Sequence, residues 1–239
     1  MLRLDKFLCD CTELTRSLAK KVIHKGRVSV NGIVIKDAGH AVKDRDIVCL
    51  DGNSLQLRGP TYIMLHKPEG FTCSTQEETH PSALDLLDVD KPDSLHFAGR
   101  LDVDTTGLIL ITDDGQWSHR ITSPKHRCDK RYRVELADPI DIKLISVFAD
   151  GIQLRGEELA TLPAKLELIP DETLPQGQTR QAYLTLQEGR YHQVKRMFGA
   201  LGNKVVALHR DRIGDLTLDP ELAPGEWRYL NDDEIKSLG

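Results

Sequence analysis

Hydrophobic residues at the start of the chain recur at the spacing of an amphipathic helix. Four of them follow the i, i+3, i+4, i+7 pattern: Leu4, Phe7, Leu8 and Cys11. A second helix is predicted after Thr15, whose hydroxyl group can cap it, and Gly26 has the backbone freedom to end it. The predicted apolar face of this second helix comprises Leu18, Ala19, Val22 and Ile23. The chain therefore opens with two short helices.

Alternating residues then predict a small sheet. Residues 27–35 alternate on both sides of Asn31-Gly32, a pair that is typical of a tight β-hairpin. Val42 and Ile47-Val48 can add further strands. The polar residues 51–60, which include Gly, Asn and Pro, are predicted to form a linker.

From Thr61 onward, short apolar runs and alternating segments mix with helical spacing. Strands are predicted over residues 62–65, 108–111, 131–136 and 182–186. Helices are predicted over residues 141–150 and 191–201, and a polar loop over residues 170–180. This mixed order predicts an α+β fold with a mixed, largely antiparallel sheet. We expect two domains, residues 1–58 and residues 59–239.

The composition is ordinary for a globular protein, since the 239 residues are 39% hydrophobic and 29% charged. No apolar run approaches the roughly 18 residues that a membrane helix needs, and the N-terminus lacks a signal peptide, so no membrane partner is expected. The five cysteines are scattered and form no CxxC pair. This spacing argues against a disulfide framework and a zinc site and favours the reducing cytoplasm. A monomer is expected.

The net charge of −5 hides an uneven distribution of cations. Residues 1–58 carry 11 Lys and Arg against 7 Asp and Glu, whereas the rest of the chain carries 21 against 30. Residues 119–133 and 190–212 are also locally basic. Because cations neutralise phosphates locally, the overall negative charge does not exclude a nucleic acid as the partner.

The first domain combines such cations with the two helices and the hairpin. Its motifs occur in the order Arg3-Leu4-Asp5-Lys6-Phe7, Thr15-Arg16-Ser17, Gly26-Arg27-Val28 and Asn31-Gly32. This order resembles the α-L RNA-binding fold, named after the fourth protein of the small ribosomal subunit. The resemblance implies a small N-terminal domain that contacts RNA phosphates without reading sequence. The expected RNA contacts are Arg3, Lys6, Arg16, Lys20 and Arg27.

A later segment, residues 99–112, is dense in turn-forming residues and carboxylates. Asp102 lies between a Gly-Arg turn and a Thr-Thr-Gly turn that leads into an apolar run, a usual setting for a carboxylate at the floor of a cleft. A metal site is not expected, because Val103 separates Asp102 from Asp104 and no third ligand lies nearby. A plain loop, in which Asp and Thr bond the local backbone, is an alternative that this segment alone leaves open.

Three further motifs accompany this segment: His66-Lys67-Pro68-Glu69-Gly70, Lys130-Arg131-Tyr132-Arg133-Val134 and Glu188-Gly189-Arg190-Tyr191-His192-Gln193-Val194-Lys195-Arg196-Met197. Together the four resemble the motifs of the pseudouridine synthases, in particular the branch that acts on the small ribosomal subunit (the RsuA subfamily). The resemblance covers essentially the whole chain. It implies an isomerase that flips out one uridine of 16S rRNA, usually numbered 516, and converts it to pseudouridine without a cofactor. Its partner would be 16S rRNA, either free or within a partly assembled small subunit.

The resemblance also assigns roles to individual residues. Asp102 is the expected catalytic carboxylate, Tyr132 stacks on the target base, and Lys195 pairs with Asp102. Many relatives have Arg at this last position, and Lys lacks the bidentate fork, so a single hydrogen bond is expected. Arg196 is a rival for the pairing role. The expected RNA contacts are Arg100, Arg120, Arg127, Arg190, His192 and Arg196, with Arg210 as a further candidate.

Three other functions are alternatives for these motifs. The nearest is a pseudouridine synthase of the large subunit (23S) rRNA, which shares all four motifs. A non-catalytic RNA-binding factor is disfavoured because a pure binder has no use for a carboxylate facing phosphate. A hydrolase of RNA or nucleosides is disfavoured because the spacing of Asp102 and Asp104 lacks further metal ligands.

Overall fold

The structure, a computed structural model, describes residues 2–43, 45–57, 59–75, 79–89 and 92–238. Its contacts divide the chain into two compact units, residues 1–59 and residues 60–239. No helix among the described residues is long and apolar enough to cross a membrane.

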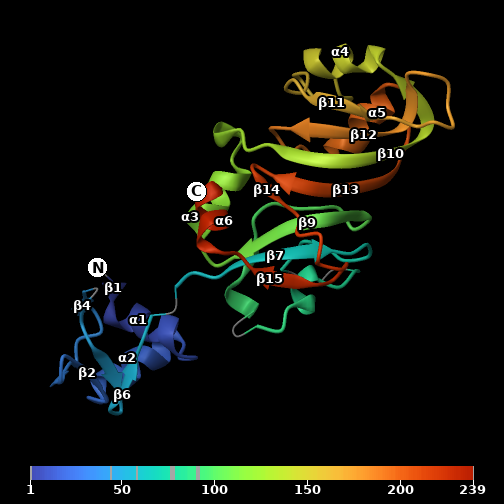
Figure 1. Cartoon of the computed structure of the whole chain (residues 1–239). Helices are drawn as coiled ribbons and strands as arrows, with labels where there is room; N and C mark the ends of the chain where they lie inside the picture. Colours follow the sequence, from blue (N-terminus) through green and yellow to red (C-terminus); the bar gives the residue numbers. More distant parts are fainter. Residues whose placement is uncertain (1, 44, 58, 76–78, 90–91, 239) are drawn as a thin grey trace. The chain divides into compact units, whose positions relative to one another are not determined.

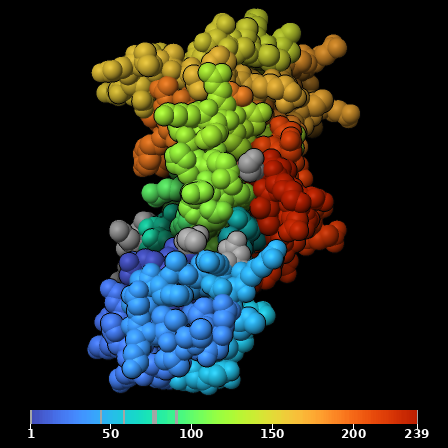
Figure 2. Space-filling model, turned by 90° about the vertical axis from the view of Figure 1, so that its left-hand side faces the viewer, coloured from blue at the N-terminus to red at the C-terminus, as the bar shows by residue number. Residues whose placement is uncertain are grey.

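The N-terminal unit combines two helices with short strands (blue to cyan in Figure 1). Its elements are β1 (Leu2–Arg3), α1 (Leu4–Cys11), α2 (Arg16–His24), β2 (Val28–Val30), β3 (Ile33–Val34), β4 (Ala41–Val42), β5 (Val48–Leu50) and β6 (Asn53–Leu55). Four strands form an antiparallel sheet in the order β3-β2-β5-β6, and β1 pairs with β4. The side chains of this unit pack together into one continuous body (blue in Figure 2).

Both predicted helices of this unit and its hairpin are present. The Thr15 hydroxyl accepts a hydrogen bond from the Leu18 N–H at 3.4 Å, which is the predicted cap of α2. Asn31 and Gly32 form the hairpin turn with φ values of +51° and +80°. Leu18, however, is half exposed, because the buried face of α2 is formed by Ala19, Val22 and Ile23.

The predicted linker over residues 51–60 is partly wrong. Asp51 and Gly52 adopt φ values of +51° and +84°, which turn the chain back, so that β6 pairs with β5. The first residues of the predicted linker therefore form a hairpin turn, and the residues after it extend the sheet. Within the predicted linker, Arg58 lies outside the described residues.

The second unit carries longer strands and four helices, besides short 3₁₀ turns, among its described residues. Its elements are β7 (Tyr62–Lys67), η1 (Ala83–Leu86), η2 (Pro92–Ser94), β8 (His96–Phe97), β9 (Thr105–Thr112), α3 (Gly115–Thr122), η3 (Pro124–His126), β10 (Lys130–Asp141), α4 (Lys143–Asp150), β11 (Lys165–Ile169), β12 (Gln178–Leu186), α5 (Gln193–Ala200), β13 (Val205–Ile213), β14 (Leu216–Thr217), β15 (Trp227–Tyr229) and α6 (Asp232–Ser237).

The described strands of this unit form one nine-stranded sheet. Its main path is β11-β12-β10-β13-β9-β7-β15, with β14 beside β13 and β8 beside β9. Every pairing is antiparallel except that of β13 with β9. The predicted α+β fold with a mixed, largely antiparallel sheet is thereby confirmed.

Strand β9 is buried on both faces, which explains its uninterrupted apolar run. Leu108 and Leu110 belong to one hydrophobic cluster, whereas Ile109 and Ile111 belong to another on the opposite face. The first cluster includes Trp117 of α3, whose indole N–H donates to the main-chain oxygen of Ile235 in α6 at 3.1 Å. The red end of the chain accordingly lies beside the green α3 in Figures 1 and 2. Neither helix was predicted.

The pairing of β9 with β13 joins the two halves of the sheet over three residue pairs. At this seam Gly107 has a φ of +107°, and a Cβ atom there would lie 2.2 Å from the main-chain oxygen of Arg210. Only glycine permits so close an approach of the two backbones. The Asp102 segment leads directly into the start of β9, so the seam positions it.

Candidate active site

Lys67 stabilises the turn that carries Asp102, and the Lys67 side chain is completely buried. Its ammonium group donates to the main-chain oxygens of Pro68 at 2.9 Å, Val103 at 3.3 Å and Thr105 at 2.8 Å. Burial lowers the pKa of Lys67. These bonds fix the backbone on the C-terminal side of Asp102.

Asp102 faces two basic side chains from the start of α5. The Nζ atom of Lys195 lies 3.1 Å from its Oδ2 atom, and the Nε2 atom of His192 lies 3.4 Å from its Oδ1 atom. The Asp102 side chain is 29% exposed, which leaves part of the carboxylate open to a substrate. The predicted pairing of Asp102 with Lys195 is present, through one carboxylate oxygen.

Lys195 also contacts Asp104, at 2.5 Å. Burial acts to lower the pKa of Lys195, but its hydrogen bonds with Asp104 and Asp102 outweigh this effect and raise the pKa. Burial acts to raise the pKa of Asp104, and the hydrogen bond from Lys195 lowers it overall. The ammonium group therefore bridges two carboxylates of the same turn, only one of which was expected.

Tyr132 lies on β10 and is partly buried between two hydrophobic clusters, one of which includes Leu101. Arg210 connects it to the Asp102 turn. The Nη1 atom of Arg210 lies 3.4 Å from the Tyr132 hydroxyl oxygen and 3.4 Å from the main-chain oxygen of Arg100. The arginine also lies 5.9 Å from the centroid of the tyrosine ring. All four motifs thus meet at one turn.

The prediction that Arg210 contacts RNA is wrong. Its side chain is only 2% exposed, and its Nε atom donates to the main-chain oxygen of Leu108 at 2.9 Å. A basic stretch of sequence does not show which of its arginines lie at the surface and which are buried. Successive side chains of β13 alternate between the two faces of the sheet.

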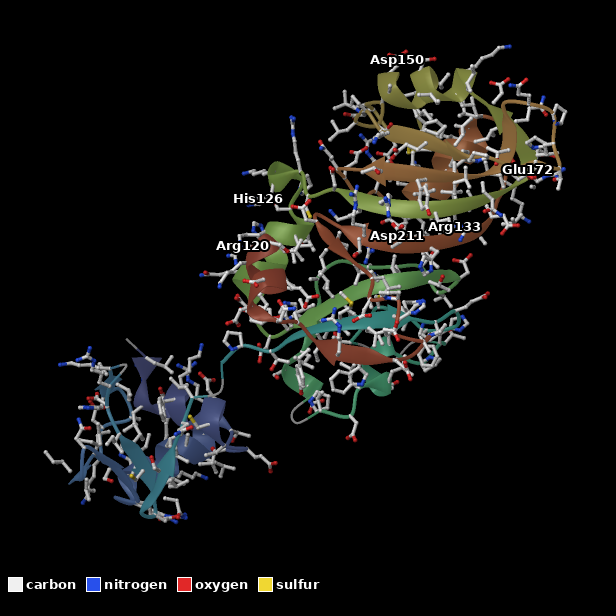
Figure 3. All side chains as sticks on the ribbon, viewed as in Figure 1. Arg120, His126, Arg133, Asp150, Glu172 and Asp211 are labelled. Carbon is white, nitrogen blue, oxygen red and sulfur yellow. The ribbon has the colours of Figure 1, made fainter. Side chains whose placement is uncertain are left out.

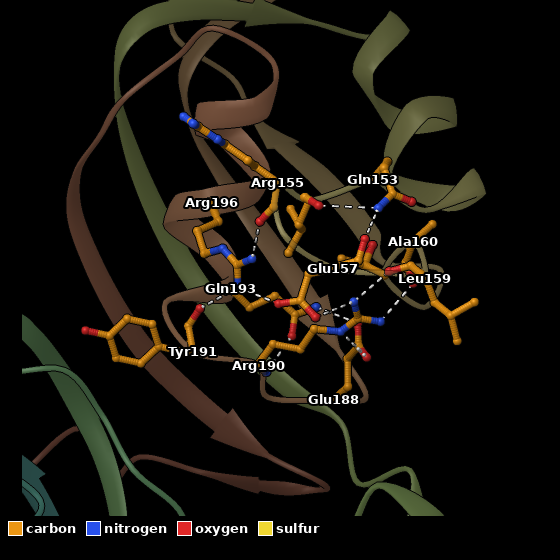
Figure 4. Close-up of polar contacts among 12 residues, drawn as sticks. Gln153, Arg155, Glu157, Leu159, Ala160, Glu188, Arg190, Tyr191, Gln193 and Arg196 are labelled. Carbon is orange, nitrogen blue, oxygen red and sulfur yellow. Dashed lines mark hydrogen bonds and ion pairs between the residues drawn. The ribbon is translucent and has the colours of Figure 1, made fainter.

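Arg190 lies in a polar network behind the start of α5 (Figure 4). Its guanidinium group donates to the main-chain oxygens of Leu159 and Ala160, both at 2.8 Å. It also pairs with Glu188 at 3.2 Å and with Glu157 at 3.5 Å. Most of its donors are therefore used within the protein, which favours a structural role over the expected RNA contact.

Arg196 belongs to the same network and does not contact Asp102. It pairs with Glu157 at 2.9 Å and donates to the main-chain oxygens of Arg155 at 3.0 Å and Tyr191 at 3.2 Å. Between the two candidates that the sequence offered for pairing with Asp102, the geometry selects Lys195.

The other expected RNA contacts of this unit lie at its surface. Arg100 is exposed. Arg120 and Arg127 line a cavity of about 380 Å³ together with His126 and Arg212. Figure 3 labels two of these residues, Arg120 and His126. The Nε atoms of Arg120 and Arg212 are buried without a hydrogen-bond partner among the described residues. Such donors suit an anion, which an RNA phosphate can supply.

In the N-terminal unit the expected RNA contacts are all exposed, but three of them also serve its structure. Arg3 makes two hydrogen bonds of 3.1 Å with the buried Asp5, and Arg16 lies 3.6 Å from the same carboxylate. Hydrogen bonding from Arg3 lowers the pKa of Asp5 against the opposing effect of burial. Arg27 pairs with Asp51. Lys6 and Lys20 extend from α1 and α2.

The helix predicted over residues 191–201 did not indicate that His192 would contact Asp102. The helix instead begins at Gln193, and His192 adopts a left-handed backbone conformation with a φ of +47°. Among the described residues, no group of three His, Cys, Asp or Glu side chains is arranged to hold a metal ion.

Two protein-family models match the chain. RNA pseudouridylate synthase matches residues 61–200, and the S4 domain matches residues 2–48.

Relatives are similar over the full length. Ribosomal small subunit pseudouridine synthase A of Vibrio cholerae is 53% identical over 237 residues, which is 99% of each chain. The protein of the same name from Escherichia coli is 50% identical over 238 residues, covering 99% of this chain and 100% of the other. A crystal structure of a pseudouridylate synthase matches with a TM-score of 0.70 and 48% identity, covering 100% of both chains.

Proposed function

Because the chain belongs to the RNA pseudouridylate synthase family and begins with an S4 domain, we propose that it converts uridine 516 of 16S rRNA to pseudouridine, with Asp102 as the catalytic carboxylate. The observation that carries the proposal is the partly exposed Asp102, paired with Lys195 at 3.1 Å on a turn that Lys67 fixes. The small-subunit name of the full-length relatives favours 16S rRNA over the 23S alternative.

The reaction breaks the bond between N1 of uracil and C1′ of ribose, turns the base, and joins C1′ to C5. The proton lost from C5 is balanced by one gained at N1, so the product is an isomer and the chemistry requires no co-reactant. Breaking the glycosidic bond makes C1′ electron-deficient, and a carboxylate next to it can attack that centre or stabilise it. Asp102 is the carboxylate that the turn presents for this step.

The neighbours of Asp102 prepare the site. Lys195 compensates the negative charge of the carboxylate and fixes its orientation through one oxygen, while the other oxygen lies nearer His192. Tyr132 offers a ring for the flipped uracil, because an extruded base needs a stacking surface. Arg210 contacts both the Tyr132 hydroxyl and the main-chain oxygen of Arg100, which fixes the position of the ring relative to the turn.

The N-terminal unit and the cavity lined by Arg120 and Arg127 would each bind the RNA through its phosphates. We place the reaction in the cytoplasm, because the five cysteines are scattered along the chain and form no CxxC pair, which favours a reducing compartment. Assays on naked 16S rRNA and on partly assembled small subunits would identify which of the two is the substrate.

The test is the substitution Asp102→Asn in the full chain. We expect a folded protein that binds RNA with unchanged affinity and loses turnover by at least about a thousandfold. The matched control is Asp104→Asn, because Asp104 also pairs with Lys195 but its side chain is 61% exposed. We expect this variant to keep turnover within about tenfold of the unmodified protein.

Pseudouridine would be mapped in both 16S and 23S rRNA after incubation with each variant. Appreciable isomerisation by the Asp102→Asn protein would remove Asp102 from the reaction. Modification of 23S rRNA alone by the unmodified chain would replace the proposed substrate with the alternative.

A further inference from the structure

Tyr191 is a large aromatic side chain that the fold leaves open. It is 77% exposed, although it lies one residue from a side chain that contacts Asp102. Its ring is stacked on the imidazole ring of His192, with centroids 3.8 Å apart and planes inclined by 20°. Since the imidazole covers one face of the tyrosine, the high exposure means that the opposite face is free to accept another flat group.

The stack is connected to the active site through His192. The Nε2 atom of His192 lies 3.4 Å from Asp102, so the open face of Tyr191 is separated from the carboxylate by one imidazole ring. His192 adopts a left-handed backbone conformation, with a φ of +47°. This conformation is unfavourable for a residue other than glycine and persists only where the surroundings impose it.

The surroundings that impose it are visible in Figure 4. Arg196 donates to the main-chain oxygen of Tyr191 at 3.2 Å and is itself held by Glu157 at 2.9 Å. On the other side of Tyr191, Arg190 is anchored to the main-chain oxygens of Leu159 and Ala160. The network therefore holds the backbone on both sides, while the tyrosine ring points away from it (Figure 4).

We propose that the Tyr191–His192 pair is a stacking platform for a nucleobase adjacent to the target uridine in the RNA. The proposal rests on the proposed function, since it presumes that a uridine reaches Asp102 inside an RNA strand. A uridine that flips out leaves its neighbour without a stacking partner. An open aromatic ring can replace that partner for any base, because every base has a flat π-face. The fixed backbone reduces the entropy lost when the base binds.

The two aromatic side chains would bind two different bases. Tyr132 is partly buried beside Arg210 and Leu101, which suits one extruded base. Tyr191 is open to solvent, which suits a base that stays in the strand. Contact with the flipped uracil and with one adjacent base would hold this part of the strand in place during the reaction.

The test compares Tyr191→Ala, Tyr191→Leu and Tyr191→Phe in the full-length protein, using a hairpin oligonucleotide of the target region. Alanine is expected to weaken RNA binding roughly ten- to hundredfold, since one stacked base contributes that much to affinity. Leucine should restore little of the loss because it has no π-face, and phenylalanine should restore nearly all of it. Turnover at saturating RNA should change less than about threefold. Tyr229→Ala, at an exposed tyrosine on β15, is the matched control and should leave affinity unchanged.

A second measurement uses RNA that lacks one base, on the 5′ or the 3′ side of the target uridine. On one of these two RNAs, Tyr191→Ala should weaken binding less than about twofold, because the stacking partner is already missing. If alanine costs the same affinity on both abasic RNAs as on intact RNA, or if it lowers only turnover, the platform is overturned. An unmodified protein that makes no pseudouridine would instead overturn the proposed function, so the two failures are distinct.

Discussion

The N-terminal unit and the segment around the start of α5 are both rich in arginine and lysine, yet they use these residues differently. In the N-terminal unit all five predicted RNA contacts are exposed, and the carboxylates that hold three of them leave their guanidinium groups at the surface. At the start of α5, Arg190 and Arg196 bind main-chain oxygens and Glu157, and Lys195 lies between two carboxylates of the Asp102 turn.

The difference shows that a basic stretch of sequence can have two functions. Exposed cations on a small unit raise affinity for RNA through phosphate neutralisation, which salt weakens. Cations engaged with carboxylates and main-chain oxygens build a rigid site and add little to that long-range attraction. Loss of an α5 cation should therefore reduce turnover or stability, whereas loss of an N-terminal cation should reduce affinity.

Among the substitutions that test this difference, the largest effect is expected from Lys195→Met. Turnover at saturating RNA should fall about a hundred- to a thousandfold, because Asp102 loses the ammonium group that compensates and orients it. Lys195→Arg should recover part of the rate, and RNA affinity should change little. Single-turnover kinetics measure both quantities, with Lys236→Met on the exposed side of α6 as the control. A variant that lost affinity and kept its rate would place Lys195 with the N-terminal cations and break the comparison.

A smaller effect is expected from Asp5→Asn. The buried Asp5 holds Arg3 and Arg16, and loss of its charge should lower the melting temperature of the N-terminal unit by roughly 4–8 °C at pH 7, the shift expected for about 1 kcal/mol in so small a domain. Since folding lowers the pKa of Asp5 from its usual 3.8, this stability is present above that value and is lost as the pH falls through the folded pKa.

Melting curves recorded between pH 7 and pH 2 measure the difference between the unmodified protein and the Asp5→Asn variant. The two curves should converge at the acidic end. A difference of the same size at every pH would show that Asp5 acts through packing and not through its charge.

The smallest effect is expected from Lys6→Gln combined with Lys20→Gln. Each neutralised phosphate contact should reduce the slope of log affinity against log salt by about one. Affinity for RNA near 150 mM salt should fall about three- to tenfold, and turnover at saturating RNA should be unchanged. Titrations at several salt concentrations measure the slope. An unchanged slope would remove these two lysines from the RNA surface, although both are exposed.

The sequence anticipated those parts of the fold that local patterns control. The two N-terminal helices, the Asn31-Gly32 hairpin and the central β9 segment follow from periodicity and turn chemistry. The strand β6 was missed because only its pairing with β5 makes it a strand. Helix α3 was missed because its buried face comprises only Trp117, Ser118 and Ile121, and one of these is polar.

In the site, the motifs identified Asp102, Tyr132 and Lys195 correctly as neighbours of a common turn, whereas the direction of each surrounding cation could not be read from the chain. Arg210 is buried although it belongs to a basic strand, and Arg196 of α5 pairs with Glu157 instead of Asp102. The contact of His192 depends on a left-handed residue before the helix. Such a conformation is set by the tertiary network and has no reliable signature in the sequence.

Lys67 gives the turn of Asp102 a property that a bound ion could not. An ammonium group surrounded by three main-chain oxygens occupies the place that a structural cation would take in a similar loop. An ion can be removed by a chelator or exchanged for another, and its occupancy varies with supply. Lys67 belongs to β7 and cannot dissociate, so the shape of the Asp102 turn is encoded in the chain and does not depend on the ions around the protein.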